Sequence, residues 1–214
     1  RAGGDRGRAG QAAAEGLAEQ GDDPKLRIAP TLYSAQALYG LGQYRKVIAT
    51  LEREPSLHDT TLSGASLGLP LRPLLMRGYW QAISLAELGR FTEAEALADE
   101  MLALSDERQP FESLYALTAH GFVLMLRGEI KAALQSSSSA FTIAEQHDIA
   151  FIIPVLGSQV GYLLAAQGTA GEGLALAQRA VQTAEQIGIN AGRSRWFARL
   201  AEVCLRAQEL ALAK

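Results

Sequence analysis

The sequence predicts an all-α fold, an α-solenoid of antiparallel helix hairpins, and three observations carry this prediction. Alanine and leucine dominate the chain while valine, isoleucine and threonine are sparse, which favours helices over strands. A short glycine-containing segment recurs about every 40 residues, and an apolar segment of helical length precedes each copy. Repeats that each contact only their neighbours build solenoids, so we expect a right-handed superhelix of such hairpins.

The repeated segment has glycine, a polar residue, a large or apolar residue, two mostly polar residues and then a small or β-branched residue. Its glycines, 47, 39 and 40 residues apart, are Gly42, Gly89, Gly128 and Gly168, and Gln208 takes the place of a fifth. Glycine adopts positive φ at low cost, so each one is expected to end a helix and turn the chain. This is the turn pattern of tetratricopeptide repeats, whose usual period is about 34 residues, so the longer period predicts longer helices.

The pattern predicts one tetratricopeptide-like array over residues 1–214. The expected elements, in chain order, are the second helix of a truncated repeat at 9–20, full hairpins at 25–53, 73–104, 111–146 and 152–187, and an incomplete terminal repeat at 193–214. Segment 54–72 is rich in proline and glycine and predicts a long loop, which accounts for the spacing of 47 residues. The start at Arg1 and the unfinished hairpin at Lys214 suggest a piece of a longer protein.

Composition and charge exclude several classes of protein. A hydrophobic fraction of 48% excludes a disordered chain. A net charge of −3 and a pI near 5.7 argue against direct binding of nucleic acid. The sequence contains no run of about 18 apolar residues, so it predicts no membrane span. The single cysteine suits a reducing compartment, so we expect a cytoplasmic protein.

Residues suited to catalysis or metal binding are scattered. The histidines, which lack partners at the i, i+4 spacing of a helical metal site, are His58, His120 and His147. Cys204 lies in an apolar stripe and is expected to be a buried core residue rather than a nucleophile. The glycines of 168–173 lack the lysine that follows a phosphate-binding loop. We therefore expect no catalytic residue, no metal and no cofactor.

Several further segments carry a family likeness; they are 68–70 (GLP), 85–94 (LAELGRFTEA), 109–114 (QPFESL), 147–154 (HDIAFIIP), 156–158, 161–162 and 191–194. With them, nearly the whole chain resembles the tetratricopeptide-like C-terminal region of bacterial adenylate/guanylate cyclases that carry an ATPase module, and of related multidomain ATPase regulators. In that family the enzymatic domains precede the repeats. The resemblance therefore implies regulation or partner binding, and no catalysis by this region.

A concave groove is the first candidate binding surface. In superhelical arrays the first helices of the hairpins line the concave side, which is the usual binding site. The repeat register places on it Leu32, Gln36, Tyr39, Met76, Tyr79, Ile83, Tyr115, Thr118, Phe122, Met125, Val155, Ser158 and Tyr162. Tyrosine and methionine are common at recognition surfaces, so a groove lined by them predicts binding of a peptide, a helix or an apolar small molecule. The alternative is that these side chains fill the core between repeats.

A second candidate surface is basic. Arg195, Arg199 and Arg206 recur at helical spacing, with Glu202 between them. They predict a contact with an acidic partner or with another domain of the same parent chain. The alternative is a solvated face whose charges are partly paired.

The sequence thus favours a non-catalytic protein–protein interaction and regulatory module, a fragment of a signalling cyclase or ATPase regulator. Its expected partner is a protein or peptide, and neither nucleic acid nor a membrane. A small-molecule sensor with an apolar pocket in the groove is the alternative. Self-association as a homodimer through an exposed end of the solenoid is a third.

Overall fold

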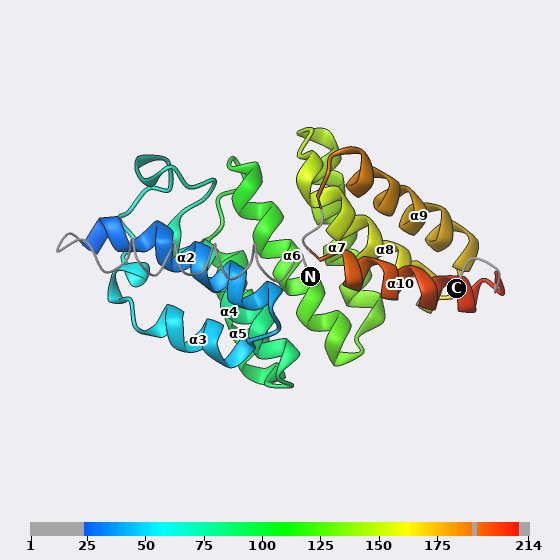
Figure 1. Cartoon of the computed structure of the whole chain (residues 1–214), viewed down its shortest axis with the longest axis horizontal. Helices are drawn as coiled ribbons and strands as arrows, with labels where there is room; N and C mark the ends of the chain where they lie inside the picture. Colours follow the sequence, from blue (N-terminus) through cyan, green and yellow to red (C-terminus); the bar gives the residue numbers. More distant parts are fainter. Residues whose placement is uncertain (1–23, 190–191, 210–214) are drawn as a thin grey trace. The chain divides into compact units, whose positions relative to one another are not determined.

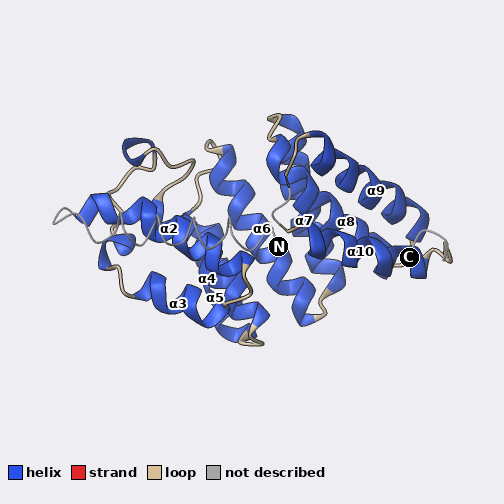
Figure 2. Ribbon diagram, viewed as in Figure 1, coloured by secondary structure: helices blue, strands red, loops and turns tan. Residues whose placement is uncertain are grey.

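The structure is a computed structural model that describes residues 24–189 and 192–209. Over these two ranges it contains nine α-helices, three short 3-10 helices and no strand (Figure 2). The prediction of an all-α fold built from helix hairpins is confirmed. The helix predicted at 9–20 and the end of the terminal repeat lie outside the described residues.

Four hairpins and a single final helix follow one another along the chain (Figure 1). The hairpins are α2 (Pro24–Gly40) with α3 (Tyr44–Glu52), α4 (Pro73–Glu87) with α5 (Phe91–Leu104), α6 (Pro110–Arg127) with α7 (Ile130–Gln146), and α8 (Ile153–Ala166) with α9 (Ala170–Gln186). The final helix is α10 (Arg193–Arg206). The segment predicted as a long loop carries two 3-10 turns, η1 (Pro55–His58) and η2 (Ala65–Leu67), and a third, η3 (Ala150–Ile152), precedes α8.

The turn residues have the backbone conformation that the repeat pattern predicts. Gly42 has φ of 72° and Gly168 has φ of 100°, in the left-handed region that glycine enters at low cost. Gln208, which replaces glycine in the last copy, still adopts φ of 63°. A left-handed residue with a side chain costs on the order of 1–2 kcal/mol, so the geometry of the turn persists at an energetic cost there.

The chain divides into two compact units, one ending at Ala119 and the other beginning at His120, so that α6 contributes to both. In the first unit, the core of α2 to α5 is built from fully buried side chains such as Leu32, Leu51 and Leu75. That both units form one array, as the repeat pattern predicts, stays a prediction.

The second unit packs α8 against α9, α7 and α10. Trp196 of α10 is 2% exposed and packs on Val181 and Ala184 of α9, which fixes the start of α10. A buried polar contact crosses between α8 and α7, where the Gln159 amide donates to the hydroxyl of Ser137 at 2.8 Å. Hydrogen-bonded polar pairs of this kind specify how neighbouring helices pack.

Candidate functional site

Most of the thirteen predicted groove residues pack between helices. Nine of them are buried, and they are Leu32, Met76, Tyr79, Ile83, Tyr115, Thr118, Phe122, Met125 and Ser158. Tyr39, Val155 and Tyr162 are half-buried, and Gln36 is exposed. The alternative raised by the sequence, a role in the core, therefore describes nine of the thirteen, and binding by the set as a whole stays a prediction.

Helix packing explains this burial in the first unit. Because α4 contacts α2, α3 and α5, its residues meet neighbours on nearly every side. The aromatic rings there form a continuous series in which Tyr44, Tyr39, Trp80, Tyr79 and Tyr115 follow one another at centroid distances of 5.3, 5.5, 4.9 and 4.9 Å. Tilted and edge-to-face pairs of this kind stabilise a core beyond the apolar area they bury.

The second unit brings the two separately predicted sets of residues together. The guanidinium carbon of Arg195 lies 5.4 Å from the ring centroid of Phe122, and that of Arg199 lies 5.8 Å from the same ring. The guanidinium of Arg206 lies 5.8 Å from the ring of Tyr162. We call the surface made by Phe122, Ser158, Tyr162, Arg195, Arg199 and Arg206 the arginine–aromatic face.

The sequence of α10 explains how its arginines reach this face. The helix has 3.6 residues per turn, so Arg195, Arg199 and Arg206 fall within about 40° of one another around its axis. Trp196 and Cys204 hold the helix in place through their burial in the unit's core. The helix carries four arginines and one glutamate, a net charge of +3 in a chain whose net charge is −3.

The three arginines differ in exposure. Arg199 is 8% exposed, and its Nη1 lies 3.4 Å from the hydroxyl of Ser158. Arg195 is half-buried and Arg206 is exposed. A guanidinium over an aromatic ring is stabilised by about 0.5–2 kcal/mol, depending on how far it is desolvated. The rings of Phe122 and Tyr162 therefore help to orient these guanidinium groups.

Arg206 does not pair with Glu202, although the two are four residues apart on α10. Within the part of the chain that the structure describes, Arg206 makes its ring contact with Tyr162 and no ion pair. The neighbour spacing of Glu202 and Arg206 thus gives no ion pair here, and the alternative of a solvated, partly paired face stays a prediction. A fourth arginine, Arg193, lies outside the face, over the ring of Phe197 at 5.2 Å and 3.4 Å from Glu185.

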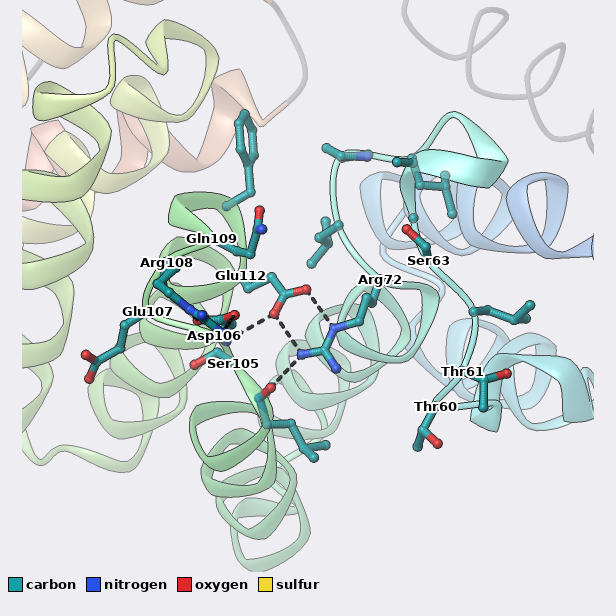
Figure 3. A pocket seen from close by; sticks show the side chains of 18 residues that line it. Thr60, Thr61, Ser63, Arg72, Ser105, Asp106, Glu107, Arg108, Gln109 and Glu112 are labelled. Atoms are coloured by element: carbon teal, nitrogen blue, oxygen red, sulfur yellow. Dashed lines mark hydrogen bonds and ion pairs between the residues drawn. The ribbon is translucent and has the colours of Figure 1, made fainter.

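A cavity of about 950 Å³ opens in the first unit, between segment 60–72 and segment 104–112 (Figure 3). Its centre is an ion pair in which Arg72 donates to both carboxylate oxygens of Glu112, each at 2.7 Å. The same Arg72 Nη2 donates to the carbonyl of Leu104 at 2.5 Å. The hydrogen bonds that it donates to Glu112 raise the pKa of the Arg72 guanidinium.

The Arg72–Glu112 ion pair is linked to further internal contacts around this cavity. Glu112 also accepts a hydrogen bond from the backbone of Asp106 at 3.1 Å. The Asp106 carboxylate accepts from Arg108, and these hydrogen bonds lower the pKa of Asp106. A ligand there would have to displace strong bidentate contacts, so the cavity is the weaker candidate. The sequence did not predict this cavity, because the prolines and glycines of segment 54–72 indicated only a loop. The signal that could have indicated it was Arg72, a charged residue at the end of that segment.

In the part of the chain that the structure describes, residue types suited to catalysis or metal binding lie apart from one another. Within residues 24–189 and 192–209, no three His, Cys, Asp or Glu side chains could hold a metal ion. Cys204 is fully buried, and burial, together with Glu209, raises the pKa of its thiol. His58 and His147 are exposed, and Nδ1 of His120 lies 2.8 Å from the hydroxyl of Ser136. Among the described helices, none combines the length and apolar character that crossing a bilayer requires.

Comparison with known proteins identifies the class of fold. No protein-family model and no curated protein matches the sequence. The chain is similar in structure to PlcR of Bacillus thuringiensis in complex with the peptide PapR7 and DNA, with a TM-score of 0.70, 16% identity, and coverage of 90% of this chain and 68% of that one. It is also similar to BtubC (BKLC) from P. vanneervenii, with a TM-score of 0.65, 12% identity, and coverage of 97% and 86%.

At such low sequence identity, the structural similarity shows the fold and nothing about function. The chain is a helical-repeat protein of the tetratricopeptide-like type, which agrees with the prediction from its repeated turn. Its membership of the cyclase-associated family stays a prediction.

Proposed function

We propose that the chain is a non-catalytic helical-repeat module that binds a peptide segment of a partner protein on the arginine–aromatic face. The observation that carries the proposal is the placement of Arg195 and Arg199 on the ring of Phe122 and of Arg206 on the ring of Tyr162. Three helices distant in sequence supply these side chains. A surface of this composition suits recognition, because arginine and tyrosine are enriched among the residues that dominate binding energy.

The chemistry of the face suits a peptide. Guanidinium groups bind carboxylates through paired hydrogen bonds, and the half-buried ring of Tyr162 offers an apolar surface with a polar tip. The similar fold of PlcR occurs in complex with a peptide, which supports this class of ligand. The same structure contains DNA, whereas the acidic composition of our chain leads us to propose a protein or peptide partner and no nucleic acid.

Regulation is the proposed consequence of binding. Within a longer cytoplasmic protein, such as a signalling cyclase or an ATPase regulator, a peptide bound on α10 would couple the presence of a partner to the activity of other domains. Self-association through an end of the array would be a second way to couple them. The module itself would contribute affinity and no chemistry.

The cavity beside Arg72 favours a second candidate function, a small-molecule sensor. Its volume of about 950 Å³ is in the range of ligand sites, and its lining mixes apolar side chains such as Leu69 and Phe111 with hydroxyls of Thr60 and Ser63. A ligand there would stabilise the first unit, which thermal unfolding in a metabolite library would detect.

Peptide selection tests the first function. Random peptides displayed on phage are selected against the whole chain, and binders are then measured by fluorescence anisotropy. We expect the Arg206→Ala variant to lose affinity for the selected peptides and the Arg193→Ala variant to keep it. Failure to select any peptide, or equal binding by both variants, would contradict the proposal.

A further inference from the structure

We propose that α10 binds an amphipathic helix of a partner protein, antiparallel to itself, on the surface formed by Phe197, Ala201 and Leu205. We call this surface the α10 outer face. Successive residues of a helix are about 100° apart, so the α10 outer face lies about 140° around the helix axis from the arginines of the arginine–aromatic face. The inference therefore concerns a second binding surface and goes beyond the proposed function.

The α10 outer face is apolar and open to solvent. Phe197 is 39% exposed and Leu205 is 56% exposed, with the half-buried Ala201 between them. Their spacing of four residues places all three within about 80° of one another around the helix axis. Arg193 lies over the Phe197 ring at 5.2 Å and 3.4 Å from Glu185 of α9, so charged side chains border the face on that side. An exposed apolar surface with a charged border is typical of a protein–protein interface.

The repeat register identifies the same face in an earlier hairpin. The turn residues Gly168 and Gln208 are 40 residues apart, so the counterparts of the α10 outer face in α8 are Gly157, Gly161 and Ala165. The structure buries all three of these residues. This face is therefore covered in α8, whereas among the described residues its large side chains in α10 remain exposed.

An antiparallel helix is the element that covers this face. A Cβ atom on Gly157 would lie 2.8 Å from the Cβ of Ala180, so α9 lies directly on α8 there. The hairpin of α4 and α5 repeats the arrangement, since a Cβ atom on Gly78, the counterpart of Gly157, would lie 2.9 Å from the Met101 side chain of α5. A helix antiparallel to α10 is thus the occupant that continues the packing seen in both hairpins.

Side-chain size sets the chemistry of the occupant. Where α8 has glycine and alanine, α10 has phenylalanine and leucine, so no helix can approach α10 as closely as α9 approaches α8. The occupant therefore needs small residues opposite Phe197 and Leu205, so that these two side chains can fill the space between the helices. The helix α9 shows the required pattern, because Gly173, Ala177 and Ala180 are the residues that it buries against α8. An amphipathic helix with glycine or alanine at this spacing fits the α10 outer face.

A synthetic helix tests the inference. The probe is a fluorescein-labelled peptide with the sequence of α9, Ala170–Gln186, capped at both ends. The control probe carries Ala177→Glu and Ala180→Glu. Fluorescence anisotropy with the whole chain should show binding of the α9 probe, and affinity lower by a factor on the order of ten or more for the control probe, because its carboxylates would be buried without partners. Circular dichroism of the mixture should show more helix than the separate components, since a short isolated helix is marginal in water.

Variants of α10 locate the binding surface. Phe197→Ser and Leu205→Ser should each weaken the α9 probe on the order of tenfold, because each removes apolar area from the contact. Leu26→Ser is the matched control, since Leu26 of α2 is 63% exposed and this variant changes a similarly exposed leucine elsewhere. It should leave affinity unchanged, and so should Arg206→Ala. All four side chains are exposed, so the variants should stay folded, which far-ultraviolet circular dichroism checks.

The outcomes decide between occupants and surfaces. If the α9 probe does not bind, gains no helix, or binds Phe197→Ser and Leu205→Ser as tightly as the original chain, the inference is overturned. If sedimentation shows that the chain alone forms a dimer that Leu205→Ser abolishes, the occupant is a second copy of the chain and the proposal of a partner helix is wrong. If Arg206→Ala weakens the α9 probe as much as Leu205→Ser does, the probe lies on the arginine–aromatic face; this inference then fails while the proposed function stands.

Discussion

Gly161 of α8 and Gly173 of α9 approach each other so closely that neither position has room for a side chain. A Cβ atom on Gly161 would lie 2.6 Å from the carbonyl oxygen of Gly173, and one on Gly173 would lie closer still to the carbonyl oxygen of Gly161. The same two Cβ atoms would lie 3.0 Å from backbone nitrogens of Ala177 and Ala165. Because these neighbours are backbone atoms, they could yield only if the whole helices moved apart.

Replacement of Gly161 by alanine should therefore destabilise the protein. Alanine in a helix is favoured over glycine by about 1 kcal/mol, but the overpacked contact costs about 1–3 kcal/mol and should exceed that gain. Gly173→Ala should act in the same way. The double variant should cost less than the two single costs added together, because one displacement of the helices relieves both contacts. Urea unfolding measures all three.

Gly171, two residues from Gly173 on the same helix, supplies the control. It is exposed, and a Cβ atom there would have nothing within 4 Å. Gly171→Ala should raise the free energy of unfolding by about 0.5–1 kcal/mol, since it adds helix propensity without a contact. Equal stability of the Gly161→Ala and Gly171→Ala variants would show that α8 and α9 do not approach this closely.

The repeat pattern could predict this close approach. Seven residues before the turn glycines stand Ala35, Ala82, Gly121 and Gly161, and the structure buries all four. A Cβ atom on Gly121 would collide with the hydroxyl oxygen of Ser137. A Cβ atom on Gly161, the same position of the next repeat, would collide with the carbonyl oxygen of Gly173. A fixed small residue at a fixed distance from a turn is a local signal, so helix crossings can be inferred from one sequence.

The contacts of the arginine–aromatic face could not be predicted in the same way. Phe122 and Arg195 are 73 residues apart in sequence, and no local pattern predicts that they meet. Arg206 had Glu202 as its expected neighbour, yet it lies over Tyr162, which approaches from another helix. Burial of Tyr79 likewise depends on helices on several sides of α4, whereas periodicity identifies only one face of a helix.

Loss of the Arg72–Glu112 ion pair should destabilise the first unit. The Glu112 side chain is 8% exposed, so the Arg72→Met variant leaves a nearly buried carboxylate without its two hydrogen bonds from the guanidinium. Loss of charged hydrogen bonds of this kind costs about 1–3 kcal/mol. Arg90→Met is the matched control, because Arg90 pairs with the exposed Glu93 and such surface pairs contribute about 0–1 kcal/mol. Thermal unfolding that ranks the two variants equally would contradict a role for the buried pair.

Tyr115 should ionise at a higher pH than an ordinary tyrosine. Burial, assisted by the neighbouring Tyr33, raises the pKa of Tyr115 to about 12, whereas tyrosine in an unfolded chain has a pKa of about 10. The neutral hydroxyl therefore contributes stability that is fully present below pH about 10 and is lost as the pH rises through about 12. Ultraviolet titration of tyrosinate should lose its latest step in Tyr115→Phe. The Tyr33→Phe variant should keep an ionisation step at high pH, because burial is the larger cause of the raised pKa of Tyr115. Loss of that step in Tyr33→Phe would show that Tyr33 is the main cause instead.

Cys204 should react with thiol reagents only when α10 opens. Its side chain is fully buried, and burial raises the pKa of the thiol, so both access and thiolate population are low in the folded protein. The chain has a single cysteine, so the rate of labelling reports one position without interference. We expect slow labelling in buffer and fast labelling in urea, with the ratio giving the free energy of the opening that exposes α10. A peptide bound to Arg195 and Arg206 stabilises the closed helix and should slow labelling further, by the factor that its concentration and affinity dictate. Arg193→Ala should keep this protection and Arg206→Ala should lose it; protection that survives in Arg206→Ala would place the peptide on another surface.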